Sequence, residues 1–456
     1  MYLLEQMASD VSLNGALPLA LAQQQLYGES GLGSVNLLAT SAMQLAVAAL
    51  QGLLQEQLSM PTKAKIDRAL VDHWCTNSVF PVGWQLPAAW DELAKDYRCA
   101  DGWIRLHTNA PHHRQSAVTV LGGVTNVNEA AEAIVSWQGQ DLEAAIVEAG
   151  GCAAQWRGQK QWQGHAQGQA VAQEPIVAWQ TSPAPIETKQ IWRAADSRRP
   201  LRGLKVLDLT RVIAGPVATR FLASLGAEVL RIDPPFWTEH GKEIDLTVGK
   251  HCAGLDLRKA EDKSQLQSLM ASADVLVHGY RKGALAGLGF DAQTIQQINP
   301  NLIAVSLNAY GATGPWQSRR GFDSLVQRST GLVVADEQRV YDLPYQVLDH
   351  ASGYLMAANV IQALRWQHKY QQTISAHVSL ARQAALLEGV DTIALSQQRL
   401  NQTHDLQPYS QDLTLEMTAW GKALRLPMPM QVQVQGVHIA WNKPASMLRT
   451  EPPQWS

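Results

Sequence analysis

Short apolar runs alternate with longer amphipathic stretches over residues 201–390. The apolar runs have the length of buried strands, and in the stretches between them apolar residues recur with helical spacing. Strands are predicted at 205–209, 229–232, 252–257, 274–278 and 302–307, and helices from Pro216 onward and over 265–271 and 291–298. Because single helices separate the strands, the pattern predicts an α/β fold with a doubly wound, Rossmann-like parallel sheet.

A long helix is predicted at 349–370 from an apolar stripe at Leu355, Ala358, Ile361 and Leu364. A strand at 373–380 and a helix at 381–395 should follow it. The sequence beyond about residue 403 has little periodicity, and we expect an extended segment that wraps a surface.

The order of elements around the long helix has a weak echo near the start of the chain. Residues 41–75 resemble 352–387: both have an apolar helix, a polar turn, a short strand and another helix. Asp349 precedes the second copy, whereas Val35 or its neighbours precede the first. If both copies are real, only the second has an acidic residue at this position.

The first 200 residues have a different pattern. Helices are predicted at 43–54, 64–74, 126–135 and 141–149, a strand at 101–107 and a Gln/Gly/His-rich loop at 163–172. Four prolines between residues 174 and 200 predict a linker. We therefore expect a helical segment (1–80), a smaller α+β domain (81–175), a Pro-rich linker (176–200), the large α/β domain (201–395) and a C-terminal wrapping segment (396–456).

Composition excludes several classes of protein. Hydrophobic residues make up 46% and charged residues 17%, which is typical of a globular protein. A net charge of −3 does not favour general nucleic-acid binding. The four cysteines form no CxxC pair, so we expect reduced thiols and neither a zinc site nor a disulfide framework. The N-terminus lacks the basic region of a signal peptide, and the apolar stretch 45–54 is too short and too polar to span a membrane, so a cytoplasmic location is expected.

Several stretches in a fixed order resemble one known family. They are LRGLKVLDLTRVIAGPVATRFLASLGAEVLRID (201–233), ADVLVHGYRKGALAGLGF (273–290), YGATGPWQSRRGFDSLVQRSTG (310–331) and LDHASGYLMAANVIQAL (348–364). Together they resemble the large domain of the family III CoA-transferases. DYRCADGWIRLHTN (96–109) and DLEAAIVEAGGCAAQWR (141–157) resemble the second half of that family. The halves are thus in reversed order, which suggests a circularly permuted, or truncated and fused, single unit.

The resemblance implies an enzyme that moves coenzyme A between carboxylic acids. Its substrates would be an acyl-CoA and a carboxylic acid, without a metal or a nucleic-acid partner. Members of the family are usually interlocked homodimers, so we expect a homodimer.

Asp349 is the best candidate for a nucleophile. By pattern alone, an Asp before an apolar helix is an ordinary N-cap. In the resemblance, Asp349 opens the D-x-x-x-G motif that ends at Gly353 and holds the nucleophile. A carboxylate can attack a thioester carbonyl to give an acyl-aspartyl anhydride and then a CoA-aspartyl thioester. The two roles can coexist.

The remaining candidates follow predicted strands, where a doubly wound sheet binds its ligands. The resemblance assigns coenzyme A contacts to Arg211, Val212, Ile213, Ala214, Arg258, Tyr280, Arg281 and Lys282, and an acyl-site position to Asn308 and Tyr310. Arg and Lys suit the phosphates of CoA by charge. Ordinary loop packing, solvated basic turns and turn chemistry are the alternative explanations for these residues.

Three positions bear on which activity is retained. Gly287 and Pro234 stand where members of the family carry arginines, so a catalytically degenerate paralogue that only binds CoA stays open. Phe322 stands where the racemase members carry a histidine. Racemisation needs an acid/base on each face of the α-carbon, so transfer is favoured over racemisation or epimerisation.

A polar cluster after the predicted strand 101–107 contains His107, Asn109, His112 and His113. Adjacent histidines face apart on a strand and are a poor chelating pair. A contact to the acyl acceptor is the alternative, because the small domain of the family covers the active site.

Overall fold

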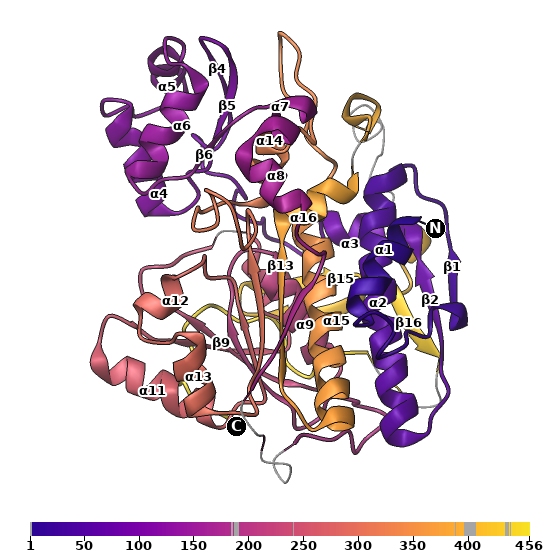
Figure 1. Cartoon of the computed structure of the whole chain (residues 1–456). Coiled ribbons are helices and arrows are strands. Elements are labelled where there is room, and N and C mark those ends of the chain that lie inside the picture. Colours follow the sequence, from indigo (N-terminus) through magenta and orange to yellow (C-terminus); the bar gives the residue numbers. More distant parts are fainter. Residues whose placement is uncertain are drawn as a thin grey trace.

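The computed structural model describes residues 2–183, 186, 191–239, 241–387, 389–395, 407–433, 437 and 439–456. Its centre is a seven-stranded sheet with β7 as the only antiparallel strand among those described (Figure 1). The strands lie in the order β10 (Lys250–Gly254), β9 (Glu228–Asp233), β8 (Lys205–Leu209), β11 (Val275–His278), β12 (Ile303–Asn308), β13 (Ile374–Ser379) and β7 (Ala178–Thr181). The predicted mixed α/β class with a parallel sheet is confirmed.

Alternate side chains of this sheet enter two different apolar layers. Val206 and Val229 belong to one core cluster, whereas their neighbours Leu207 and Leu230 belong to another. The first cluster joins the sheet to α9 (Ala214–Ser224), α15 (Val347–Tyr370) and α2 (Gly33–Leu58). The second joins it to α11 (Ala260–Ala271), α12 (Ala284–Gly287) and α13 (Ala292–Ile298). The central strands β8 and β9 therefore bury both of their faces, as their continuous apolar runs require.

The two ends of the chain contain the same arrangement of elements. In one, β2 (Lys63–Asp67) follows α2, pairs in parallel with β1 (Gln24–Tyr27) and is followed by α3 (Arg68–Thr76). In the other, β13 follows α15, pairs in parallel with β12 and is followed by α16 (Leu380–Ala384). Each copy also receives an antiparallel strand from the other half of the chain: β7 pairs with β13, and β16 (Met430–Gln433) pairs with β2. The halves are thus interlocked by exchanged strands.

The helices α2 and α15 pack side by side where the two copies meet (Figure 1). Gly52 of α2 permits this approach, because a Cβ there would lie 2.4 Å from the guanidinium carbon of Arg365 on α15. Arg365 also pairs with Glu56, with 2.8 Å between Nε and Oε2. The contact between the helices therefore depends on the small residue Gly52 and on the buried Arg365, whose charge Glu56 of α2 neutralises.

A smaller module lies at the upper left of Figure 1. Its three-stranded antiparallel sheet comprises β4 (Asp96–Cys99), β5 (Gly102–Leu106) and β6 (Ala153–Gln155), covered by α4 (Pro111–Val120), α5 (Val127–Ile134) and α6 (Gly139–Glu148). It joins the large sheet through α14 (Asp323–Ser329), where Arg328 pairs with Asp96 at 2.7 Å. This module therefore faces the segment that precedes α15.

The other described elements complete the fold. They are α1 (Tyr2–Val11), the α7 (Gln159–Gly164) and α8 (Ala166–Ala172) pair, α10 (Glu243–Leu246), and a sheet of β14 (Thr414–Thr418), β15 (Gly421–Arg425) and β3 (Val79–Pro81). Single 3₁₀ turns occur at Leu21–Gln23, Ala385–Leu387 and Gln407–Tyr409. All four cysteines are buried free thiols.

Several sequence-based predictions of secondary structure were wrong. Residues 64–74 begin with strand β2, because Ala64 and Ile66 face the core while Lys63 and Lys65 do not. Asp67 then caps α3 by accepting from the N–H groups of Ala69 and Leu70. The predicted loop 163–172 is largely helical.

Contacts with residues distant in sequence explain why the predicted loop 163–172 is helical. The side-chain amide of Gln167 on α8 donates to the carbonyl oxygens of Tyr310 and Thr313 at 2.7 and 2.8 Å. These bonds stabilise a polar helix that has little apolar periodicity of its own.

Two further corrections concern the helices beside the core. The predicted helix 381–395 stops early, and Gly389 takes a left-handed conformation with φ of 79°. α2 has 26 residues, more than the predicted twelve, and by length and composition could cross a membrane. However, 94% of its most apolar window is buried inside the fold. The tail forms strands in β14, β15 and β16, while the predictions for 396–406 lie outside the described residues.

Candidate active site

Asp349 lies in the first turn of α15 and is 7% exposed. The N-cap of this helix is Gln346, and no side chain caps it, so the prediction of Asp349 as an ordinary N-cap was wrong. Gly353, one turn later, allows α15 to approach α9 closely. A Cβ on Gly353 would lie 2.5 Å from the carbonyl oxygen of Ala214 and 2.7 Å from the Cβ of Val217. The D-x-x-x-G spacing therefore places the Asp349 carboxyl beside the loop that starts α9.

A second buried carboxyl supports Asp349. Oδ2 of Asp323 accepts the backbone N–H of Asp349 at 2.9 Å, and Oδ1 accepts the amide of Gln327. Burial raises the pKa of Asp323 to about 6. Burial, and then the charge of Asp323, raise the pKa of Asp349 well above its usual value. Two carboxyls in one low-dielectric place resist joint ionisation, an arrangement that clusters at functional sites.

The loop between β8 and α9 is strained beside this carboxyl. Val212 has φ of 67°, a left-handed conformation that a β-branched residue rarely adopts. Its N–H donates to Oε1 of Glu239 at 2.7 Å, and the same oxygen accepts from Nε1 of Trp237 at 2.8 Å. Glu239 is neutralised by Arg231 at 3.0 Å. Strain of this kind, held by surrounding contacts, is typical of ligand-binding loops.

A cavity of about 340 Å³ opens at the carboxyl ends of β8, β11 and β12. This is the point at which the strand order reverses, where sheets of this type bind ligands. Its wall includes Asp349 and the predicted residues Arg211, Val212, Ala214, Tyr280, Arg281 and Asn308.

Three guanidinium groups make this first cavity electropositive. Arg211 lies over the rings of Trp237 and Tyr280, with 5.0 and 5.5 Å to the ring centroids. Arg281 and Arg320 line the same wall, and neither forms an ion pair with a carboxylate in the described ranges. Burial, and then the charge of Arg320, lower the pKa of Arg281. Neighbouring cations that repel each other in this way favour the binding of an anion, which offsets their repulsion.

A second cavity of about 540 Å³ lies on another side of Asp349. It extends between the small module, the loop around Glu239 and the start of α15, and it includes the predicted residue Ile213. Both cavities have Asp349, Val212, Trp237 and Phe322 in their walls. The carboxyl of Asp349 therefore lies where two ligand-sized spaces meet.

The structure does not bring every predicted residue to these cavities. The side chain of Arg258 is 68% exposed and pairs with Asp256. Tyr310 is 1% exposed and hydrogen-bonds Ser329 at 3.0 Å. Lys282 donates to the carbonyl of Ala312 at 3.0 Å. The ligand roles of Arg258 and Tyr310 remain predictions without geometric support, whereas Lys282 lines a separate cavity of about 860 Å³ with Tyr280 and Arg281.

Asn308 reaches the first cavity but its side chain is already engaged. Its amide group donates to the carbonyl of Gly311 and its oxygen accepts the Gly311 N–H, at 2.7 and 2.8 Å. Asn308 therefore shapes the turn after β12.

Three further side chains line the cavities: sequence reasoning had placed His107 and His113 in a polar cluster, with a contact to the acyl acceptor as one alternative, but it did not select Arg320. Arg320 follows a turn rather than a strand, so the strand-end rule missed it. The two histidines come from the small module, and only tertiary packing brings them to Asp349. Among the described residues, no group of three or more His, Cys, Asp or Glu is placed to hold a metal ion.

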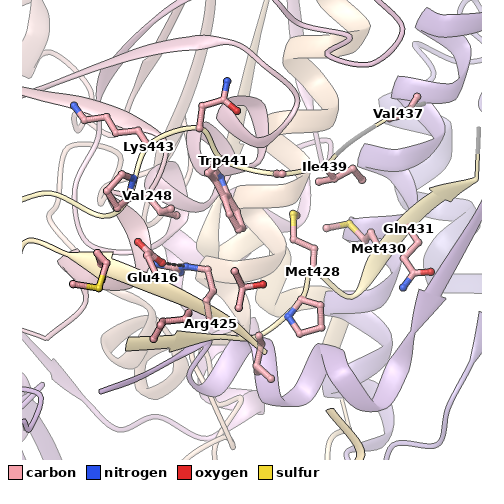
Figure 2. A pocket seen from close by; sticks show the side chains of 18 of the residues that line it. Val248, Glu416, Arg425, Met428, Met430, Gln431, Val437, Ile439, Trp441 and Lys443 are labelled. Atoms are coloured by element: carbon pink, nitrogen blue, oxygen red, sulfur yellow. Dashed lines mark hydrogen bonds and ion pairs between the residues drawn. The ribbon is translucent and has the colours of Figure 1, made fainter. Parts of the chain in front are cut away.

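A larger cavity, of about 620 Å³, lies elsewhere. Figure 2 shows it between β14, β15 and the segment that carries Ile439, Trp441 and Lys443, with the Glu416–Arg425 ion pair in its wall. Its described lining is mostly apolar and does not include Asp349. The chemistry of the strand ends is therefore not located there.

Comparison with known proteins gives matches to CoA-transferases. Residues 201–412 match the model of CoA-transferase family III. The "Probable fatty acyl-CoA transferase Rv3272" of Mycobacterium tuberculosis is 34% identical over 184 residues, 36% of this chain and 46% of that protein. The formyl-CoA:oxalate CoA-transferase of Escherichia coli O81 is 30% identical over 230 residues, 46% of this chain and 54% of that protein. The chain thus spans about half the length of these relatives.

A crystal structure of Rv3272 is 28% identical in sequence, covers 50% of this chain and 64% of that chain, and aligns with a TM-score of 0.39. The similarity to CoA-transferase family III is thus a sequence match over residues 201–412.

Proposed function

We propose that this protein transfers coenzyme A between carboxylic acids, with Asp349 as the covalent nucleophile. The observation that carries the proposal is the position of Asp349, whose carboxyl lies between an electropositive cavity and a second, larger cavity. The match of residues 201–412 to the family supports the reaction class. The strained loop at Val212 supports a ligand site at the same place.

The proposed reaction is balanced without a net proton. The Asp349 carboxylate adds to the thioester carbonyl of the donor, the C–S bond breaks, and an acyl-aspartyl anhydride and CoA thiolate form. The thiolate attacks the aspartyl carbonyl, which releases the donor acid and leaves a CoA-aspartyl thioester. The acceptor carboxylate attacks that thioester, and the thiolate then attacks the acceptor carbonyl of the new anhydride. The free carboxylate of Asp349 is restored, and no ATP is needed.

The first cavity suits coenzyme A in this scheme. Arg211, Arg281 and Arg320 would face its phosphates, since guanidinium groups bind phosphate oxygens with charge-assisted hydrogen bonds. The second cavity would then hold the acyl chain and the acceptor acid. The identity of these acids, a cytoplasmic location and a homodimer remain predictions.

Trapping of the covalent intermediate tests the proposal. Protein incubated with an acyl-CoA and then with hydroxylamine should yield an aspartyl hydroxamate at residue 349, which peptide mass spectrometry detects. Exchange of a labelled carboxylic acid into acyl-CoA should accompany it. If CoA binds but neither the adduct nor exchange occurs over a broad panel of acyl-CoAs, the chain is a CoA-binding protein and the proposed activity is wrong.

Light scattering addresses the assembly. A homodimer has twice the chain mass of 49.9 kDa. A single-chain mass would instead indicate that the internal α2–α15 contact replaces a contact between two subunits.

A further inference from the structure

His107 of the small module stacks flat against Phe322, which lines both cavities. The ring of His107, directly after β5, stacks on Phe322 with 3.7 Å between centroids and 3° between planes. The edge of Trp90 closes another side at 5.8 Å. Phe322 precedes Asp323, whose carboxylate accepts the N–H of Asp349. The imidazole is therefore held in a defined position against Phe322, in the wall of the larger cavity that Asp349 also lines.

Apart from an interaction with its own backbone, the ring of His107 has no hydrogen bond to another described residue. His107 is 5% exposed, and its Nδ1 is sealed without a hydrogen-bond partner. No hydrogen bond joins its Nε2 to any residue within the described ranges. The residue lines the larger cavity together with Asp349. A buried polar group that lacks a partner costs free energy, unless a ligand supplies the missing bond.

Several polar groups beside Asp349 already have partners, although Oγ of Ser324 and Nδ1 of His350 in the larger cavity, and both ring nitrogens of His113 in the first cavity, lack one. The N–H of Asp349 is bonded to Asp323, and that of Val212 is bonded to Glu239. The side chain of Asn308 is bonded to Gly311 at both ends. Each addition step of the transfer creates a negative oxygen on the attacked carbonyl carbon, which needs a fixed donor. His107 has an N–H available for that purpose.

The charge state of His107 favours a donor over a base. Burial, and then the charges of His113 and Arg105, lower its pKa to about 3. The imidazole is therefore neutral at physiological pH, with one N–H and one lone pair. So weakly basic a ring is poorly suited to remove a proton from carbon, whereas an uncharged N–H can stabilise a developing oxyanion.

We propose that His107 is a catalytic residue of the transfer reaction, whose uncharged ring donates an N–H hydrogen bond to the oxyanion formed when the Asp349 carboxylate, or CoA thiolate, adds to a carbonyl carbon. This inference rests on the proposed CoA transfer. It gives the small module a chemical role in addition to covering the site.

Steady-state kinetics of two variants tests this role. His107→Ala should lower kcat on the order of 10²-fold and leave KM for acyl-CoA within about threefold, because the lost bond forms only in the transition state. His107→Gln keeps an N–H donor at a similar reach and should recover at least about tenfold of that loss. His368→Ala is the matched control, since His368 lies near the other end of α15, about 28 Å along the helix from Asp349, and should keep full activity.

Folding and the underlying reaction are checked separately. Circular dichroism must show native folding of each variant, and trapping on the wild-type protein reports whether CoA transfer occurs at all. With wild-type transfer established, a folded His107→Ala variant within about threefold of wild-type kcat overturns the proposal. It is equally overturned if His107→Gln is no faster than His107→Ala, or if only KM changes. Exchange of the α-proton in deuterated water that depends on His107 would instead show that the ring acts as a base.

Discussion

Replacing the nucleophile should make this protein more stable while it removes activity. Asp349→Asn keeps the shape of the side chain but cannot ionise. In the wild type, burial and the charge of Asp323 raise the pKa of Asp349 well above its usual value. The same environment moves the pKa of Asp323 from 3.8 to about 6, which corresponds to about 3 kcal/mol against its ionised form. We therefore expect a gain in the free energy of unfolding of about 1–3 kcal/mol at pH 8 in the variant.

The pH dependence of this gain has a definite sign. A carboxyl whose pKa is raised in the folded state destabilises the fold wherever it is ionised. The loss in free energy of unfolding that the wild-type carboxyl causes therefore grows as pH rises from about 4 through the raised pKa. This loss is absent below about pH 4, where the carboxyl is protonated in both the folded and the unfolded state. The stability gap between Asp349→Asn and wild type should be largest at pH 8 and should close towards pH 4. Turnover of the wild type should rise with pH over the same range, because only the ionised carboxyl is nucleophilic.

Urea denaturation at several pH values, with acyl-CoA exchange assays beside it, measures both effects. Asp245→Asn provides a contrasting control. Burial opposes the ionisation of Asp245, but Arg220 and other nearby cations overcome it and lower its pKa. Loss of that charge should destabilise the protein at pH 8. The reasoning on Asp349 is refuted if Asp349→Asn is less stable than wild type at pH 8, or if it keeps more than about a tenth of wild-type turnover.

Three other perturbations test the site and the fold. Arg211→Ala and Arg281→Ala should each weaken CoA binding by about 1–3 kcal/mol. Calorimetry at rising salt concentration should show that the difference in binding free energy between wild type and variant shrinks. Unchanged affinity in both variants would place the ligand elsewhere. Gly353→Ala should cost about 1–3 kcal/mol of stability and lower kcat, because the added Cβ would collide with α9. Gly287→Ala is the control and should be nearly neutral, because open space surrounds that position. Equal unfolding midpoints for the two variants would contradict the packing argument. Limited proteolysis within 174–200 should leave two fragments that co-elute on a sizing column, because β7 and β16 are exchanged between the halves, and separate elution would refute that interlocking.

Local pattern was sufficient for much of the large domain. The apolar runs predicted strands β8, β9, β11, β12 and β13 within one or two residues, since strands buried on both faces leave a continuous apolar signal. The long helix was predicted from Asp349 and begins at Val347. The polar helix α8 was missed, because its stability comes from partners distant in sequence such as Tyr310. The internal echo predicted a short strand within 41–75, but local periodicity assigned the residues of β2 to a helix, because its pairing with Met430 is not visible in local sequence.

Some residues of the candidate site could likewise be predicted from local sequence, whereas others depend on tertiary packing. The order of motifs in the sequence singled out Asp349, and the strand-end rule predicted Arg211, Tyr280 and Arg281, because their positions relative to strands are local properties. The packing of the small module on α14 was needed to bring His107 to Phe322, across more than two hundred residues of chain. The raised pKa of Asp349 also depends on burial and on the charge of Asp323, which no sequence spacing reports. The sequence by itself thus determined the parallel strands of the large domain, the long helix and the nucleophile candidate. Tertiary structure alone decided the ionisation of that nucleophile and its neighbours from the small module, because both depend on distances between segments far apart in the chain.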